Sequence, residues 1–417
     1  MLARWPGLAA LAAAVLLASG CGGLGAAATT EATGSQLAIY SSLPLQGPSA
    51  ALSQQIVNGE KLALSQAGGE VGPLKIGYVS LDDADPSTGQ WSASVTASNA
   101  KTAAQDPSAI AYLGDYNSGA TAISLPVMNA AGILQVSPGS PYVGLTQSLD
   151  AGQDEPGRFY LSGRRNFGRL QPGDPVQAAA QVALMRSLHV RRVFVIDDQD
   201  PFETPLATIA ASDAEHAGIA LAAHDSIATP EGATFTSEVE KVVQSGAQAV
   251  LFAGGGGPGA LALWRELHSA DPHLLLLGTS SMLGEAFTSQ LGPAADATYL
   301  STPILAPALY PPGAQRVLSE YRRSFHGEAG PYALYGYEAM SVVLAAIRRA
   351  GAHGNARQAV IDQFFATSNR DSVLGRYSIQ PDGETTLMRY GVDRVQGGRA
   401  VFDRVITPVV SSSAAGG

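Results

Sequence analysis

The chain has 417 residues, 46% of them hydrophobic and 14% charged, and this composition excludes a disordered protein and a coiled coil. With 25 Lys and Arg against 35 Asp and Glu, the net charge is −10, which argues against binding to nucleic-acid phosphates. The single cysteine excludes an internal disulfide and any zinc or iron–sulfur site built from several cysteines. The length leaves room for two or three domains.

The N-terminal residues are typical of an export signal. Arg4 precedes an uncharged run, Leu8–Ser19, which is shorter than the roughly 20 apolar residues of a membrane-spanning helix. Residues 1–20 are therefore predicted to be a signal peptide. The segment LASGC, which ends at Cys21, resembles a bacterial lipobox, with Ala18 where Leu is more usual. We expect Cys21 to carry a lipid that anchors the mature chain, and a plain secretory signal with an incidental cysteine is the alternative.

Two further segments are predicted to lie outside the folded part of the chain. Residues 21–35 are small and polar, which predicts a flexible tether, and residues 409–417 are predicted to be a disordered tail. No segment after the signal is long and apolar enough to predict a transmembrane helix. With the lipid anchor, the protein is expected to be extracytoplasmic, on the outer face of the cell membrane or in the periplasm.

The body of the chain alternates short apolar runs with helical patterns. The first series has predicted strands at 37–40, 74–81, 110–113 and 133–136 and helices at 49–67, 87–105 and 119–131. The second series has strands at 193–196, 219–223, 249–252 and 274–277 and helices at 175–188, 202–217, 234–245 and 258–269. Repeated strand–helix units predict parallel sheets covered on both faces. Two series predict two α/β lobes, each with a doubly wound parallel sheet.

The alternation ends after Tyr299. Three predicted helices follow at 311–326, 333–350 and 355–365, and β segments close the chain at 373–379, 385–395 and 399–405. This order predicts that the chain crosses between the lobes several times, in a multi-crossover hinge. Lobe I is expected to comprise residues 36–165 and 301–373, and lobe II is expected to comprise residues 166–300 and 374–408.

The loops at one edge of each sheet are the candidates for ligand binding. Ligands of open α/β sheets bind outside the carboxyl ends of the strands, so facing lobes would enclose one cleft. The seven loops at those ends are 44–49, 82–87, 114–118, 137–141, 198–202, 254–257 and 278–281.

Short islands of sequence occur in an order that matches a known family. They include Gly47-Pro48, Asn58-Gly59, Asp82-Asp83-Ala84, Asp85-Pro86, Gly132-Ile133-Leu134, Ser137-Pro138-Gly139, Pro331-Tyr332, Tyr337-Glu338-Ala339 and Pro381-Asp382-Gly383. On these residues the chain resembles, over residues 36–405, the leucine/isoleucine/valine-binding family of solute-binding lipoproteins, which has the type I periplasmic-binding fold. The resemblance implies capture of a small polar or amphipathic solute (an amino acid, an amide or a small carboxylate) for an ABC importer.

The resemblance also implies a ligand site between the lobes. The residues at the family's ligand-binding positions are Leu52, Ser118, Gly119, Gly139, Ser140, Phe202, Gly256, Ser280 and Tyr337. Ser118 and the amides that follow it open a predicted helix, where free N–H groups favour a carboxylate. Except for Ser118 and Tyr337, each of these residues is equally well explained by loop structure or packing.

Five positions depart from the family's pattern, and at one of them Leu52 stands in for an aromatic residue. Pro141 replaces a threonine, Phe202 replaces a tyrosine, and Gly256 stands where a second tyrosine is expected. Ser280 stands where a glutamate would pair with the ligand's ammonium group, and a buried ammonium without such a partner costs several kcal/mol. The carboxylates that could replace it from neighbouring positions are Asp198, Asp200 and Glu285.

The remaining motifs favour neither an enzyme nor a cofactor. Gly254–Gly259 satisfies G-x-G-x-x-G, but the acid expected after the next strand is missing, because residues 278–280 are Gly-Thr-Ser. A turn that needs positive φ, followed by Pro258 as the first helical residue, explains the same residues. The aspartates within 82–85 lack the other ligands of a calcium loop and are predicted to cap the next helix. The seven histidines show no metal-ligand spacing, and no nucleophile–base set is present.

The sequence therefore predicts a monomeric capture protein, tethered to a membrane through Cys21. It would close on a small-molecule solute and deliver it to a membrane permease and its ATPase, without a metal, a cofactor or nucleic acid. Two alternatives stay open at this point. One is a ligand-sensing lipoprotein that reports to a partner receptor, and the other is a nicotinamide-dependent enzyme that uses the Gly254 turn.

Overall fold

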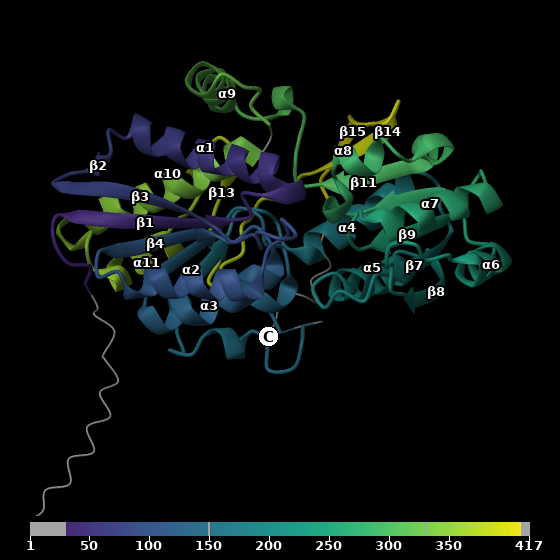
Figure 1. Cartoon of the computed structure of the whole chain (residues 1–417), viewed down its shortest axis with the longest axis horizontal. Helices are drawn as coiled ribbons and strands as arrows, with labels where there is room; N and C mark the ends of the chain where they lie inside the picture. Colours follow the sequence, from purple (N-terminus) through teal and green to yellow (C-terminus); the bar gives the residue numbers. More distant parts are fainter. Residues whose placement is uncertain (1–30, 149–150, 331, 410–417) are drawn as a thin grey trace, which may run out of the picture.

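The computed structural model describes residues 31–148, 151–330 and 332–409. The predicted signal peptide, Cys21 and residues 410–417 of the predicted tail lie outside the described residues. Two lobes lie side by side, each built on one sheet with helices against it (Figure 1). The predicted α/β class with two lobes is thereby confirmed. Within the described ranges, no helix is long and apolar enough to cross a membrane.

The sheet of lobe I has six strands in the order β2-β3-β1-β4-β5-β6. The central strand β1 (Gln36–Leu43) is parallel to both of its neighbours, β3 (Leu74–Asp82) and β4 (Ala109–Gly114). The other strands are β2 (Glu70–Val71), β5 (Leu134–Ser137) and β6 (Phe167–Arg169). Only β2, at the edge, pairs in the antiparallel sense among these six strands.

Helices cover both faces of this sheet. They are α1 (Ala50–Gln66), α2 (Ala93–Gln105), α3 (Ser118–Ala131), α9 (Pro312–Phe325), α10 (Tyr332–Ala350) and α11 (Arg357–Phe365). The alternation of side chains along β1 explains the two layers. Leu37 and Ile39 share a core cluster with α1 and α10, whereas Ala38 and Tyr40 share one with α2 and α3.

The sheet of lobe II has seven strands in the order β15-β14-β11-β10-β9-β7-β8. Its strands are β7 (Arg192–Asp197), β8 (Ala220–Ser226), β9 (Ala249–Ala253), β10 (Leu275–Gly278), β11 (Thr298–Thr302), β14 (Tyr390–Gln396) and β15 (Arg399–Ile406). The first five are parallel, and β14 and β15 are antiparallel.

Lobe II repeats the layering of lobe I. Its helices are α4 (Asp174–Ser187), α5 (Thr204–His216), α6 (Thr236–Ser245), α7 (Pro258–Ala270) and α8 (Glu285–Thr288). Along β7, Val193 and Val195 pack with α4 and α5, whereas Phe194 and Ile196 pack with α6 and α7. Strands buried on both faces account for the nearly continuous apolar runs in the sequence.

Three connections join the lobes. β6 leads into α4, β11 leads into α9, and a segment following the hairpin of β12 (Arg370–Asp371) and β13 (Arg376–Tyr377) leads into β14. The multi-crossover hinge expected from the sequence is therefore present. β6 belongs to the first sheet and β11 to the second. The predicted domain boundaries at residues 165 and 301 stay a prediction.

A fully buried arginine forms hydrogen bonds and an ion pair at these crossings. Arg169, at the end of β6, donates hydrogen bonds to the backbone oxygens of Ser140 at 2.7 Å and Tyr142 at 2.9 Å. Its guanidinium also pairs with the Glu384 carboxylate at 2.8 Å. The apolar core continues across the same place, because Phe167 of β6 and Val193 of β7 belong to one core cluster.

Most predicted elements match the structure within a few residues, but three segments differ. The helix expected from residue 87 begins at Ala93, because residues 84–91 form a turn closed by a bridge between Ala84 and Trp91. Asp85 accepts a hydrogen bond from the Ser87 N–H at 2.7 Å and so caps this turn, not a helix. The β segment expected at 373–379 contains only β13, and the segment expected at 385–395 pairs in its sheet only from residue 390.

The end of the predicted tether belongs to the folded part of lobe I. Ala32 is buried, and its N–H donates to the Asn355 oxygen at 2.7 Å. The Thr33 N–H donates to the Pro107 oxygen at 3.0 Å. The prediction of a flexible tether up to residue 35 is therefore wrong for these residues, because their backbone groups are bonded to the lobe.

Candidate functional site

The N-terminus of α3 lies at the carboxyl edge of the lobe I sheet. β4 ends at Gly114, and a short loop turns the chain into α3 at Ser118. The Thr121 N–H donates to the Asn117 oxygen at 3.0 Å, whereas the amides of the preceding helical residues have no intrahelical acceptor. Asn117 Oδ1 is buried without a hydrogen-bond partner among the described residues. Free amides and the helix dipole make this point suitable for a carboxylate.

Aromatic side chains from both lobes meet at this helix terminus. A Cβ atom at Gly119 would lie 2.6 Å from Trp91 Cζ2 and 2.8 Å from Phe202 Cε2. Phe202 precedes α5 of lobe II, and its ring packs edge-on against Tyr142 with centroids 5.1 Å apart. The Tyr142 N–H donates to Ser118 Oγ at 3.3 Å. The structure thus brings Ser118, Gly119 and Phe202 together, and their role in binding stays a prediction.

Glu203 lies at the same junction, directly after Phe202. Its Oε1 accepts a hydrogen bond from Ser281 Oγ, and its Oε2 is buried without a partner among the described residues. Burial raises the pKa of Tyr116 in lobe I, and the charge of Glu203 adds to that rise. We define the interlobe cluster as Trp91, Tyr116, Ser118, Gly119, Tyr142, Phe202, Glu203 and Ser281.

The electrostatics of Glu203 set it apart from the other acids nearby. Burial raises the pKa of the Glu203 carboxyl to about 7, and the hydrogen bond from Ser281 opposes that rise. The charges of Asp198 and Asp200 raise the pKa further. A carboxylate with a buried, unpartnered oxygen is the group that a cationic ligand would satisfy, and a bound cation would return its pKa toward the usual range.

The acids named from the sequence have other partners or lie exposed. Asp198 accepts hydrogen bonds from the N–H groups of Gly255 at 2.9 Å and Asp200 at 3.1 Å. Asp200 itself accepts one from the Phe202 N–H at 2.8 Å, and Glu285 is exposed. Sequence reasoning missed Glu203 because a single acid before a helix has no periodic signature. The available signal was its position, one residue after a ligand-binding position of the family.

Gly139 and Ser140 support the loop before α3 from within lobe I. A Cβ atom at Gly139 would lie 2.5 Å from Tyr116 Cδ2, so the missing side chain makes room for that ring. Ser140 is fully buried, its Oγ lies 2.7 Å from Thr121 Oγ1, and it donates to the Asp115 oxygen at 2.9 Å. These contacts position Tyr116 and the first turn of α3.

Three other predicted residues have contacts within a single lobe. A Cβ atom at Gly256 would lie 3.2 Å from the Cβ of Phe287 in lobe II. Ser280 Oγ donates to Gln177 Oε1 at 3.4 Å, also within lobe II. Leu52 is partly buried against the core cluster of lobe I. Among the described contacts, none links these three residues across the junction.

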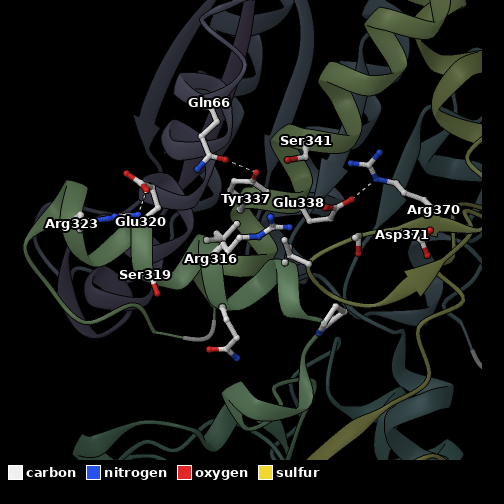
Figure 2. Close-up of a pocket in the computed structure, with 16 residues that line it drawn as sticks. Gln66, Arg316, Ser319, Glu320, Arg323, Tyr337, Glu338, Ser341, Arg370 and Asp371 are labelled. Carbon is white, nitrogen blue, oxygen red and sulfur yellow. Dashed lines mark hydrogen bonds and ion pairs between the residues drawn. The ribbon is translucent and has the colours of Figure 1, made fainter.

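Tyr337 lines a different hollow. Its hydroxyl donates to Gln66 Oε1, at the end of α1, at 2.7 Å. The hollow has a volume of about 920 Å³ between α9, α10 and the β12 region, and it shares no lining residue with the interlobe cluster (Figure 2). The structure does not bring Tyr337 to Ser118, and Tyr337 is therefore not part of the site proposed below.

Close packing explains some of the glycines after β9, but a Cβ atom at Gly255 or Gly257 would meet nothing within 4 Å. Pro258 is the first residue of α7, but none of the glycines at 254–257 has positive φ, so the prediction of such a turn is wrong. A Cβ atom at Gly254 would lie 2.6 Å from the Asp198 carboxylate, and one at Gly259 would lie 2.0 Å from the Thr229 oxygen.

Two buried carboxyls lie in lobe I behind the loop that leads to α3. Asp83 and Asp115 are fully buried, and neither oxygen of Asp83 has a hydrogen-bond partner among the described residues. Burial raises the pKa of Asp83 to about 8, and the charge of Asp115 adds to that rise. Burial raises the pKa of Asp115 to about 7 against the opposing hydrogen bonds from Ser124 and Tyr112. In the described ranges, no group of three or more His, Cys, Asp or Glu residues could hold a metal ion.

Comparison with curated proteins finds relatives that span most of the chain. An "amino acid binding protein" of Pseudomonas aeruginosa is 26% identical over 353 residues, which cover 84% of this chain and 87% of the relative. A "Leu/Ile/Val-binding protein homolog 1" of Brucella suis is 26% identical over 351 residues, with the same coverage of both chains.

Solved structures share the fold at lower sequence identity. The leucine-binding protein LivK of Thermotoga maritima has a TM-score of 0.74 at 20% identity, over 89% of this chain and 99% of that one. LivJ of Streptococcus pneumoniae, solved with isoleucine, has a TM-score of 0.71 at 18% identity, over 89% of this chain and 100% of that one. A solute-binding protein of Rhodopseudomonas palustris, solved with benzoate, has a TM-score of 0.71 at 17% identity and covers 91% and 98%.

A family model decides the assignment. The model described as "periplasmic binding protein" matches residues 41–399, which include most of both sheets and all three crossings. The two-lobed fold of the solved neighbours agrees with this match. The chain belongs to the periplasmic binding protein family.

Proposed function

We propose that the chain binds an α-amino acid between its lobes, as the capture component of an ATP-driven importer. The free amides at the start of α3, with the Ser118 hydroxyl, would hold the carboxylate. Glu203 of lobe II would hold the ammonium group. Trp91 and Phe202 would cover the apolar atoms and exclude water. The observation that carries this proposal is the buried, unpartnered Oε2 of Glu203 at the junction of the lobes.

The choice of an amino acid over an amide or a simple carboxylate rests on charge. A ligand without an ammonium group would leave the Glu203 oxygen unpartnered, and an unpaired buried polar group costs about 1–3 kcal/mol or more. A carboxylate ligand without a cationic group would also place a second negative charge at the junction. An amino acid supplies one group to each lobe, so its binding would favour the closed arrangement.

Isothermal titration calorimetry with leucine and 4-methylpentanoate tests this proposal, because the two ligands differ only in the ammonium group. We expect the protein to bind leucine, or another branched-chain amino acid, and to bind the matched acid far more weakly. Glu203→Gln should weaken amino-acid binding by about tenfold to a hundredfold, the value of a hydrogen bond to a charged group of ~1.5–3 kcal/mol.

The control is Glu285→Gln, which neutralises an exposed acid in the same lobe and should leave the affinity unchanged. Equal binding of leucine and 4-methylpentanoate would contradict a role for the ammonium group. Wild-type affinity in the Glu203 variant would show that another residue binds the ammonium group. If no amino acid binds at all, the proposed ligand class is wrong.

The finer assignments of location and partners are also proposals. Cys21 would bear a lipid that holds the protein on the outer side of a membrane, and a permease with its ATPase would receive the solute from a monomer. Support comes from the lipobox-like segment and from the family. Fractionation of cells that express Cys21→Ala should find the protein released from membranes, and continued retention would argue against the anchor.

A further inference from the structure

The hollow beside Tyr337 is built from four separate parts of lobe I. Its lining includes Gln66 at the end of α1, Arg316 of α9, Tyr337 and Ser341 of α10, and Arg370 of β12. Its volume of about 920 Å³ is within the range of small-molecule sites, roughly 300–1,000 Å³. Figure 2 shows Arg316 reaching from α9 toward Tyr337 and Glu338 of α10, with Arg370 beyond them. No part of the proposed amino-acid site contributes to this lining.

The charged groups of the hollow are neutralised in pairs, with one exception. Arg323 pairs with Glu320 on α9, and Arg370 pairs with the buried Glu338 at 2.5 Å. Arg316 forms no ion pair or hydrogen bond with the residues that the structure describes. Asp371 also lines the hollow, and it lies 3.9 Å from Arg376, which is outside the lining. The lining thus holds three arginines and three carboxylates, and Arg316 is the cation of this lining that has no ion pair among the described residues.

Hydrogen-bonding groups converge on the same point. The Tyr337 hydroxyl donates to Gln66 at 2.7 Å. Burial raises the pKa of Tyr337, and the charges of Arg370 and Arg316, which line the same hollow, oppose that rise. Arg370 is held in place by Glu338, whose Oε1 also accepts a hydrogen bond from Tyr377 at 2.9 Å. A fixed guanidinium, a free one and a phenol hydroxyl thus face one space.

We propose that this hollow binds a small molecule through an oxyanion group, a phosphate or a carboxylate, held by Arg316 with Arg370. The planar guanidinium matches both oxyanions with paired N–H donors. This site is independent of the interlobe cluster and of the amino acid proposed there. The rest of the ligand would lie against the polar and apolar wall formed by α9, α10 and the β12 region.

Calorimetric titration of the whole mature protein with inorganic phosphate, pyrophosphate and citrate tests the proposal. We expect saturable binding of at least one of them, with sodium chloride at matched ionic strength giving no such signal. A response to phosphates alone assigns a phosphate group, and a response to citrate alone assigns a carboxylate. Absence of binding by all three, or an equal effect of chloride, would overturn the proposal.

Variants on one helix locate the binding. Arg316→Ala should weaken anion binding at least about tenfold, ~1.4 kcal/mol, and Arg316→Lys should retain part of it. The matched control is Arg322→Ala, since Arg322 is also on α9 but faces Glu328 at 3.3 Å and does not line the hollow. Unchanged anion binding in Arg316→Ala would refute the site. Leucine binding, measured in the same variants, should not change, so failure of the amino-acid site and failure of this one are distinguishable.

Discussion

Phe202 and Glu203 are consecutive in the chain but differ in how far the sequence could define their role. Phe202 occupies a position that the family resemblance points to, and the structure places its ring at the start of α3. Glu203 occupies no such position, and only the structure shows that its Oε2 is buried without a partner among the described residues. The loss of an acid at Ser280 stays a prediction, and the neighbouring Ser281 donates a hydrogen bond to Glu203. Contacts between side chains that are far apart in the chain depend on the folded structure, so no local sequence pattern predicts them.

Tyr337 shows that a residue can match the family in identity and still lie outside the proposed site. Its identity matches the family, yet its hydroxyl bonds Gln66 and its ring lines the hollow beside α9. The identity of a helical residue does not fix the direction of its side chain, because that depends on the register of α10 against α1. Tyr337→Ala is therefore expected to leave amino-acid binding unchanged, contrary to the expectation from resemblance.

Gly119 offers a test of the contact between the lobes. Gly119→Ala should weaken amino-acid binding by about tenfold, since relieving an overpacked contact costs ~1–3 kcal/mol. The added methyl group would lie within 3 Å of both Trp91 and Phe202, and separating the lobes is the way to relieve the Phe202 clash. Helix α3 itself should be unharmed, because Ala is the best helix former.

Small-angle scattering with and without leucine measures this effect. The Gly119 variant should fail to contract on adding the amino acid at a concentration that contracts the wild type. Gly257→Ala is the matched control, because Gly257 also precedes a helix and a Cβ there would meet nothing within 4 Å. Normal contraction and affinity in Gly119→Ala would show that the lobes do not close on this point.

At the scale of elements, α1 and α10 show what periodicity could and could not foresee. Both helices were predicted from their apolar spacing, and both exist. Their close approach depends on two glycines, since a Cβ atom at Gly59 would lie 2.1 Å from the Ala333 oxygen and one at Gly336 would lie 2.1 Å from the Ile56 oxygen. The sequence shows these glycines inside helical patterns, but only the packed pair explains them.

The helix pair therefore predicts a strong effect of one methyl group. Gly336→Ala should lower the free energy of unfolding by about 1–3 kcal/mol, although Ala is the better helix former, because the obstructing atom belongs to the backbone and cannot rotate away. Thermal or urea unfolding measures the change. Gly313→Ala on α9 is the control, since a Cβ there would meet nothing within 4 Å. Equal stability of the two variants would contradict the close packing.

Element boundaries were less predictable where side chains compete with the backbone. The helix expected at residue 87 starts at Ala93 because Asp85 and the bridge to Trp91 stabilise a turn instead. The β segment expected at 373–379 has the apolar residues of a strand but only two paired residues. Other backbone groups of this segment bond outside a sheet, for example the Gly375 N–H with the Ser372 oxygen at 3.4 Å and the Ile379 N–H with the Thr367 oxygen at 3.0 Å.

At the scale of the whole molecule, buried acids predict how stability depends on pH. Glu60, Asp83 and Asp115 are fully buried. Burial raises the pKa of Glu60 from 4.5 to about 8, that of Asp83 from 3.8 to about 8 and that of Asp115 from 3.8 to about 7. Below the lower value both states hold the proton. Between the two values only the folded state holds it, so the free energy of unfolding falls as pH rises through this window.

Melting temperatures across the window test this sign. The protein should melt at a higher temperature near pH 5.5 than near pH 8.5, because ionising a buried carboxyl opposes folding. Glu60→Gln should reduce the difference, since Gln keeps the shape and has no proton to release. Glu285→Gln, at an exposed position, should not. A melting temperature that rises toward alkaline pH would contradict the buried, neutral state of these carboxyls.

The architecture of the whole molecule was the most predictable level. Alternating strands and helices, the block of helices after residue 299 and the terminal β segments were sufficient to predict two parallel sheets with several crossings. The strand order within each sheet and the meeting of Gly119 with Phe202 were not predictable, because they depend on how the crossings orient the lobes.

The contacts of Arg169 predict how the protein unfolds. Its buried guanidinium bonds Ser140, Tyr142 and Glu384, while Phe167 beside it shares one apolar core with Val193. Unfolding one lobe alone would leave the buried guanidinium of Arg169 without partners and would expose the apolar core that the lobes share. The halves should thus denature as a single cooperative unit, which gives one calorimetric endotherm although the chain has two lobes.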